Sequence, residues 1–209
     1  MIYPKLKEIL SKALNIKRER ALALDNIITQ LNSLKHPRNH LKLNFICTHN
    51  SRRSQMAQVW AHVISQHLSL PITVFSGGVE VTAFNKRAIE TLMNHGLKIT
   101  IGKSHQKKQT QTQNNIYDVY CGPEDNGLQC FSKLYDDQAN PKSEFVAIMT
   151  CDHADENCPF IPGALARIPL SYKDPKIYDN TPLEASKYQE CSLDISSELY
   201  YILTRLKPM

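Results

Sequence analysis

The stretch from Cys47 to Ser54 combines residue types that could attack and hold a tetrahedral oxyanion. Cys47 follows an apolar segment typical of a buried strand, and after five intervening residues Arg53 and Ser54 open a segment with helical periodicity. In such a loop, backbone N–H groups and the N-terminus of the helix point into one concavity and favour negative charge there. Arg53 at the rim could bind two oxygens of phosphate or arsenate in a bidentate fork.

The same positive field favours the thiolate form of Cys47, and the Ser54 hydroxyl can donate a hydrogen bond to its sulfur. The competing interpretation is a buried structural cysteine in front of a basic helix start. A cysteine and an arginine five residues apart form a weak pattern by themselves. The preceding strand, Ser54 and the following helix together favour the catalytic interpretation.

Cys151 and Cys158 form a second candidate site, because they follow the apolar segment Phe145–Met149. In a doubly wound parallel sheet of order 2-1-3-4, the first and third strands are neighbours, roughly 4.8 Å apart. Cys47 and Cys151 are therefore expected at the same carboxyl edge. Were the seven-residue step from Cys151 to Cys158 helical, it would span ~10.5 Å, and a disulfide needs Cα atoms within roughly 4.4–6.8 Å. Bridging the pair would require that segment to bend or unwind.

Two other interpretations of these cysteines remain open. In the first, both are inert packing residues. In the second, Cys151, His153 and Cys158 bind zinc, although they lack a compact four-ligand pattern. Redox function is favoured over both. The remaining cysteines are interpreted as packing or surface residues: Cys121, Cys130 and Cys191.

Asp174 lies in the sequence Tyr172-Lys-Asp-Pro175, shortly after another apolar segment, and is expected at the same carboxyl edge. A carboxyl group there could protonate a leaving oxygen as a general acid. The alternative is an aspartate that only initiates a turn before proline.

Alternating strand-like and helix-like segments predict an α/β fold with a parallel sheet and helices on both faces. The expected strands are Leu41–Ile46, Ile72–Phe75, Phe145–Met149 and Ala166–Leu170. The expected helices are Arg53–Leu68, Ala88–His95 and Leu183–Leu206.

Two regions fall outside this alternation. Residues 1–40 carry apolar positions at helical spacing and predict a helical N-terminal extension to a catalytic domain of residues 41–209. Residues 103–144 predict an insertion that contains a β-hairpin, with Ile116–Tyr120 and Leu128–Phe131 flanking a turn.

The composition is that of an ordinary globular protein, with 42% hydrophobic and 22% charged residues and a formal net charge of +5. The basic excess is spread along the chain, so we expect no nucleic-acid partner. No apolar run approaches the ~20 residues that span a bilayer, and the first residues do not predict an export signal. We therefore expect a cytoplasmic protein without a membrane partner, whose six cysteines are reduced.

The sequence Cys47-Thr-His-Asn-Ser-Arg-Arg-Ser-Gln-Met-Ala57 resembles the signature of the low-molecular-weight protein tyrosine phosphatases, and more closely that of the related thioredoxin-coupled arsenate reductases. The similarity runs from about Leu43 to the C-terminus, apart from the insertion. It implies a four-stranded parallel sheet, with Cys47 as nucleophile and Arg53 as oxyanion ligand. It also implies that further residues bind the oxyanion or support the loop, namely Thr48, His49, Asn50, Ser51, Arg52, Ser54 and Ser76.

The resemblance assigns Asp174 to the family's Asp-Pro general acid. Reductases of this kind carry two cysteines at the seven-residue separation of Cys151 and Cys158, in a similar stretch ending Asn-Cys-Pro, and the phosphatases generally do not. Gln58 stands where some reductases have a carboxylate ligand for potassium, so a potassium site is not carried over to this chain, and no metal or other cofactor is predicted.

These features predict an arsenate reductase that reduces arsenate to arsenite through Cys47 and a disulfide relay to Cys151 and Cys158, with a thioredoxin-like reductant as partner. The first alternative is a phosphatase that hydrolyses phosphomonoesters such as phosphotyrosine through a cysteinyl-phosphate. The second is a non-enzymatic oxyanion or redox sensor.

Overall fold

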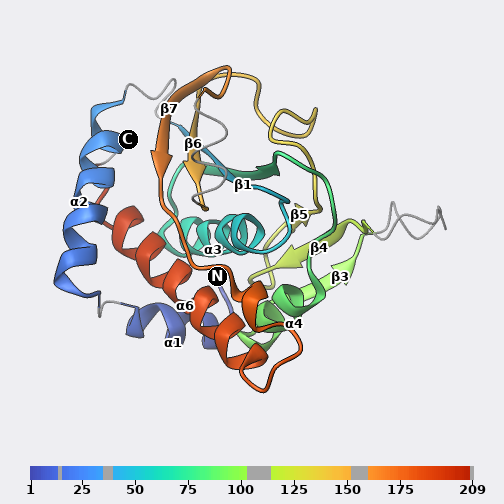
Figure 1. Cartoon of the computed structure of the whole chain (residues 1–209). Coiled ribbons are helices and arrows are strands. Elements are labelled where there is room, and N and C mark those ends of the chain that lie inside the picture. The colour runs from blue at the N-terminus through green and yellow to red at the C-terminus, as the bar shows by residue number, and fades with distance from the viewer. Residues whose placement is uncertain (14–15, 35–39, 103–113, 152–159, 208–209) are drawn as a thin grey trace.

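A four-stranded parallel sheet forms the centre of the computed structural model, in the order β2-β1-β6-β7 (Figure 1). This order confirms the predicted 2-1-3-4 topology. Its strands are β1 (Leu41–Cys47), β2 (Ile72–Gly78), β6 (Phe145–Met149) and β7 (Ala164–Pro169). The structure describes residues 1–13, 16–34, 40–102, 114–151 and 160–207.

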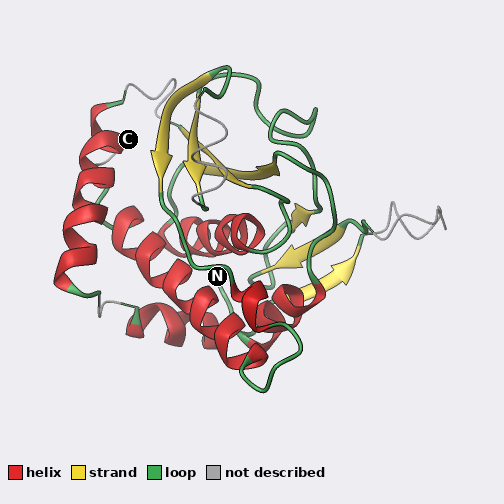
Figure 2. Ribbon diagram, viewed as in Figure 1, coloured by secondary structure: helices red, strands yellow, loops and turns green. Residues whose placement is uncertain are grey.

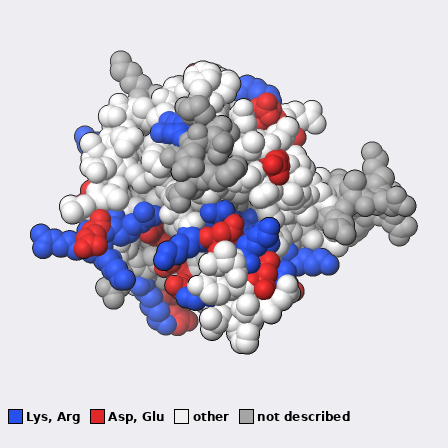
Figure 3. Space-filling view, viewed as in Figure 1, with Lys and Arg blue, Asp and Glu red and all other residues white. Residues whose placement is uncertain are grey.

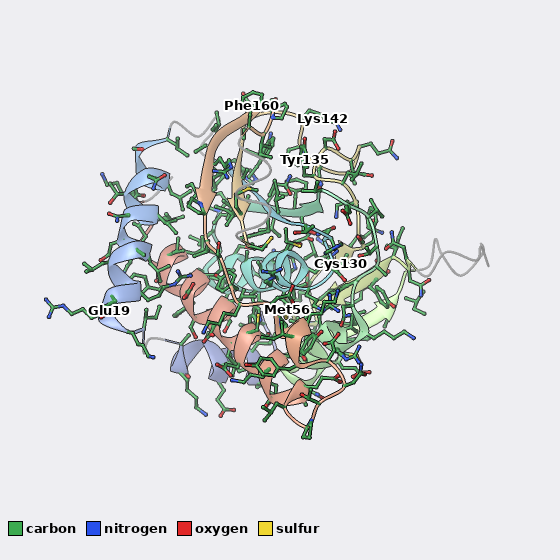
Figure 4. All side chains as sticks on the ribbon, in the orientation of Figure 1. Glu19, Met56, Cys130, Tyr135, Lys142 and Phe160 are labelled. Carbon is green, nitrogen blue, oxygen red and sulfur yellow. The ribbon has the colours of Figure 1, made fainter. Side chains whose placement is uncertain are left out.

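Side chains alternate between the two faces of this sheet, as the two-residue period of a strand requires. Phe45 and Ile148 join the larger apolar core, whereas the adjacent residues Ile46 and Met149 join a smaller cluster with Tyr135 and other apolar side chains. Figure 4 shows Tyr135 on one side of the sheet and Met56, on α3, on the other. Both faces of β1 and β6 are buried, and their nearly continuous apolar sequence reflects this.

Helix α3 (Arg53–Leu68) packs directly on β1 and β2, and α6 (Glu184–Leu203) packs on α3 (Figure 2). The bounds of α3 match the prediction, and the helix is buried on almost every side from Ser54 to Ser65, as expected of a helix packed between a sheet and a second helix. Helix α4 spans Lys86–Asn94, so it begins two residues before the predicted start. The Asn85 side chain caps it by accepting hydrogen bonds from the N–H groups of Arg87 and Ala88.

The N-terminal extension consists of α1 (Pro4–Lys12) and α2 (Arg18–Ser33), and both helices contact α6 (Figure 1). Their apolar side chains, among them Leu6 and Leu24, belong to the same core as the sheet. Arg20 of α2 forms a bidentate ion pair with Glu198 of α6 and also donates to the carbonyl of Ser171. On the face shown in Figure 3, acidic and basic side chains intermix in a band that includes these helices.

The insertion contributes to a second, antiparallel sheet of order β3-β4-β5. The predicted hairpin corresponds to β4 (Tyr117–Tyr120) and β5 (Leu128–Cys130), and β3 (Lys98–Ile101) adds a strand that was not predicted. The Lys-Ile-Thr-Ile sequence of β3 is too short for its alternation to stand out. No helix among the described residues is long and apolar enough to cross a membrane.

Candidate active site

Cys47 is the last residue of β1, and the chain turns sharply before α3 begins at Arg53. The turn uses a left-handed backbone at Asn50 (φ 46°), a conformation that asparagine tolerates better than most residues. The N-cap residue of α3 is Arg52, whose side chain has no acceptor for the first-turn amides. The helix therefore starts without a side-chain cap, and an anion in the loop could accept from those N–H groups.

The Cys47 sulfur lies 3.0 Å from the Ser54 Oγ, and the Asn50 amide donates to the same oxygen at 2.9 Å. Because Ser54 accepts from Asn50, its own proton is available to donate to a Cys47 thiolate. The Asn50 Oδ1 in turn accepts from the Lys133 N–H and the Gln55 side chain. Asn50 and Ser54 are fully buried, so this network fixes the loop around the sulfur.

Arg53 and Asp174 lie together, although 121 positions separate them in the sequence. The Arg53 Nη2 donates to the Asp174 Oδ2 at 2.7 Å, and its Nη1 donates to the Tyr172 carbonyl at 3.0 Å. The second Asp174 oxygen accepts from the Lys176 N–H and caps the 3₁₀ helix η2 (Pro175–Tyr178). An oxyanion in the loop would compete with Asp174 for the Arg53 fork.

Cys151 lies two residues after β6 and is buried, at the carboxyl edge where Cys47 ends β1. Ile46 pairs in register with Met149, so the two strands end side by side. The Thr48 hydroxyl lies 3.5 Å from the Cys151 sulfur, which puts Cys151 against the residue that follows Cys47. Cys158 and His153 fall outside the described residues, so their placement relative to Cys151 is not described.

Three other loop residues turn their side chains outward from the loop. His49 pairs with Glu80 at 3.3 Å, and Ser51 donates to the Ala83 carbonyl at 2.7 Å. Arg52 donates to the Tyr188 hydroxyl of α6 at 2.7 Å and to Asp179 at 3.3 Å. Arg52 therefore anchors the loop to the C-terminal helix.

Ser76 lies in β2 and is fully buried. Its hydroxyl donates to the Gln58 Oε1 at 2.6 Å, which ties β2 to α3 beneath the loop. Gly78 was not singled out from the sequence, but a Cβ there would lie 2.8 Å from both the Asn50 nitrogen and the Thr48 oxygen. The Gly77-Gly78 pair after a predicted strand was the signal for this close approach.

A cavity of about 580 Å³ adjoins the loop at His49, Ser51 and Arg52. Lys86, Arg87 and Lys176 contribute positive charge to its lining, and the aromatic rings of Phe84 and Tyr117 lie in an edge-to-face contact at its wall. The cavity is large enough for an aromatic group beside the oxyanion loop and electrostatically suited to an anion.

Comparison with known proteins agrees with this geometry. The family model for low molecular weight phosphotyrosine protein phosphatases matches residues 42–120. Arsenate reductase 2 of Staphylococcus epidermidis and an arsenate reductase of Staphylococcus aureus are each 30% identical to the chain over 131 residues. In both cases the match covers 63% of this chain and 76% of the relative. The chain belongs to this family of low-molecular-weight phosphatases and related arsenate reductases.

Solved structures of the family show the same fold. A low-molecular-weight phosphotyrosine phosphatase from Vibrio cholerae O395 superposes with a TM-score of 0.52 at 14% identity, covering 78% of this chain and 95% of the other. An arsenate reductase in its phosphate-binding state gives a TM-score of 0.50 at 16% identity, and the superposition covers 80% of this chain and 99% of the other. This member of the family is an enzyme of the arsenate reductase or phosphatase type.

Proposed function

We propose that the chain reduces arsenate to arsenite through Cys47, with Cys151 and Cys158 as a disulfide relay. The observation that carries this proposal is the position of Cys151, buried beside the oxyanion loop with its sulfur 3.5 Å from the Thr48 hydroxyl. A phosphatase would need no second thiol at this edge. Relatives at 30% identity that are named arsenate reductases support the same choice.

In the first step, the Cys47 thiolate attacks arsenate held by the loop amides and the Arg53 fork, and an oxygen leaves as water. The Ser54 hydroxyl stabilises the thiolate, and Asn50 keeps the loop in shape. Asp174 supplies a proton to the departing oxygen as the general acid, once Arg53 has turned to the oxyanion. The product is a Cys47–arsenic(V) adduct.

In the second step, the Cys151 thiolate attacks the Cys47 sulfur. A Cys47–Cys151 disulfide forms, the sulfur–arsenic bond breaks, and its electron pair reduces arsenic(V) to arsenite. Cys158 then attacks Cys151 and frees the Cys47 thiolate, and an external dithiol of the thioredoxin class reduces the Cys151–Cys158 bond. Because the relay requires reduced thiols in the resting enzyme, we assign it to the cytoplasm.

Mass-spectrometric disulfide mapping after exposure to arsenate tests this proposal. The reduced protein should form a Cys151–Cys158 disulfide, and Cys158→Ser should release one arsenite and stop as a Cys47–Cys151 disulfide. Cys151→Ser should release none. If arsenate produces no disulfide, or both variants turn over repeatedly like the parent, the reductase proposal is wrong.

A second candidate function is phosphomonoester hydrolysis, and the cavity beside the loop favours it. Arsenate alone would not fill about 580 Å³, whereas the aromatic ring of an aryl phosphate could lie against Phe84 and Tyr117 in this cavity beside the loop. An aryl phosphate assay distinguishes the two functions, because water replaces the second thiol in hydrolysis. Cys151→Ser and Cys158→Ser should leave that activity within about threefold of the parent.

A further inference from the structure

Three metal-binding side chains meet at a second position along α3, away from the oxyanion loop. They are His62, Cys121 and Asp125, and their ligand atoms all lie within 4.8 Å of one another. His62 projects from the middle of α3, while Cys121 and Asp125 belong to the connection between β4 and β5. We propose that this cluster binds a single zinc-class divalent ion that fastens the antiparallel sheet to α3.

The donor atoms are already close to the arrangement that such an ion requires. The His62 Nε2 lies 3.0 and 3.1 Å from the two Asp125 oxygens. Ligand atoms around a tetrahedral zinc lie roughly 3.3–3.8 Å apart, given metal–ligand bonds of about 2.0–2.3 Å. Small side-chain rotations would bring all three donors to one ion.

The cluster also has the charge that zinc would balance. Burial leaves the side chain of Asp125 5% exposed and that of His62 13% exposed, and Cys121 is 1% exposed as a residue. A thiolate and a carboxylate together carry two negative charges, and a neutral imidazole adds none. A Zn²⁺ ion would neutralise the set, whereas the thiolate beside a carboxylate without an ion would be strongly disfavoured in this buried position.

The surrounding backbone holds two of the ligands in place, as the outer contacts of metal sites do. Asp125 accepts from the Cys121 N–H at 2.8 Å and from the Gly127 N–H at 3.1 Å. The Cys121 carbonyl accepts from the Tyr3 N–H at 2.8 Å, which brings the N-terminal extension to the same point. A bound ion would therefore join α3, the small sheet and the chain N-terminus.

The proposed ion takes no part in the chemistry at Cys47. His62 follows Ser54 by eight residues on α3, which corresponds to about 12 Å along the helix axis. Three protein ligands leave one coordination position, which water can fill. The alternative is a hydrogen-bonded His62–Asp125 pair with a thiol packed beside it, and the experiment below decides between the two.

The test uses a background variant in which Cys47, Cys151 and Cys158 are all serine, so that thiols near the oxyanion loop cannot supply a signal. Titration with Co²⁺ should give one equivalent of binding and a cobalt–thiolate absorption band. Native mass spectrometry should show one Zn²⁺ per chain, and Zn²⁺ should raise the melting temperature. Added to this background, Cys121→Ser should abolish the thiolate band, and His62→Gln or Asp125→Asn should weaken Zn²⁺ binding at least about tenfold.

Cys130→Ser is the matched control, because Cys130, at the end of β5 (Figure 4), is also fully buried but does not belong to the cluster. It should keep both the band and the stoichiometry. The proposal is overturned if the background protein retains no Zn²⁺ and shows no thiolate band. It is also overturned if Asp125→Asn and His62→Gln, folded by circular dichroism, bind Zn²⁺ like the background.

Discussion

Helix α3 carries two clusters of similar composition, and we propose a reaction at only one of them. At its first turn, Cys47 lies beside Ser54, with Arg53 paired to Asp174. Two turns later, His62 pairs with Asp125 next to Cys121. Each cluster contains a cysteine at the end of a strand or directly after it, a basic side chain and an aspartate.

The difference lies in what surrounds each sulfur. Cys47 faces the uncapped N-terminus of α3 and the Ser54 hydroxyl, which stabilise negative charge. Cys121 lies beside the middle of the helix, where backbone amides are already bonded, and beside a carboxylate. Burial and the hydrogen bond to Asp125 raise the pKa of the Cys121 thiol well above its usual range. The two cysteines therefore differ in the groups that surround their sulfurs, according to their position along one helix.

Replacing Cys47 or Cys121 by serine should give the largest difference in turnover between the two clusters. Cys47→Ser should reduce turnover of arsenate and of an aryl phosphate by more than about 10⁴-fold, because it removes the nucleophile. Cys121→Ser should keep turnover within about threefold, since its sulfur lies outside the reacting loop. Steady-state kinetics on folded protein measure both. Equal losses of turnover in Cys47→Ser and Cys121→Ser would show that the two clusters do not differ in catalytic role.

The second largest difference in turnover is expected between variants of the two aspartates, Asp174 and Asp125. Asp174→Asn keeps the shape of the side chain but removes the proton donor, so hydrolysis of aryl phosphates with poor leaving groups should fall by ~10²–10⁴-fold. Asp125→Asn should leave the rate nearly unchanged for every leaving group. A uniform, small loss across leaving groups in Asp174→Asn would instead make Asp174 a turn residue that only caps η2.

Ser54→Ala should have a smaller effect than either catalytic substitution. A hydrogen bond to a charged group contributes about 1.5–3 kcal/mol, so turnover should fall roughly 10- to 100-fold as the thiolate loses its donor. Ser65→Ala, on the same helix but bonded to the His62 carbonyl, is the control and should change turnover less than threefold. Unchanged rates in Ser54→Ala would show that the loop amides alone stabilise the thiolate.

The smallest expected effect is the pH-dependent contribution of Asp125 to the free energy of unfolding. Burial alone would raise the pKa of Asp125, but hydrogen bonds from His62 and the Cys121 N–H outweigh it and hold that pKa below its usual range. A lowered folded pKa stabilises the protein above the unfolded value near ~3.9, and the gain is lost as pH falls further. In chelator-treated protein, Asp125→Asn should therefore cost about 1–3 kcal/mol of unfolding free energy at pH 7.

Urea unfolding at a series of pH values measures this loss, which should shrink as the pH falls below about 4. Asp174→Asn is the comparison, because its partly exposed pair with Arg53 should contribute less than about 1 kcal/mol. A pH-independent difference between Asp125→Asn and the parent would mean that packing, and not charge, accounts for the role of Asp125.

Apolar periodicity predicted the strands of the parallel sheet and the bounds of α3, because it is a local property that long segments record clearly. The strand order came instead from the doubly wound topology assumed for such a sheet. The loop from Cys47 to Ser54 could also be predicted from the sequence, since all of its residues are consecutive in the chain. The short strand β3 was not predicted, because four residues carry too little periodicity. Its pairing partner β4 also lies beyond the polar stretch at 103–113.

The predicted topology placed Cys47, Cys151 and Asp174 at one edge of the sheet, but the atoms that pair there are visible only in the folded structure. The pairing of Arg53 with Asp174, the contact of Thr48 with Cys151 and the anchoring of Arg52 on Tyr188 each join residues more than a hundred positions apart. The cluster of His62, Cys121 and Asp125 likewise depends on how the small sheet packs against α3. Spacing along a chain fixes what lies on one turn, whereas contacts between elements depend on packing, for which a single sequence carries no local signal.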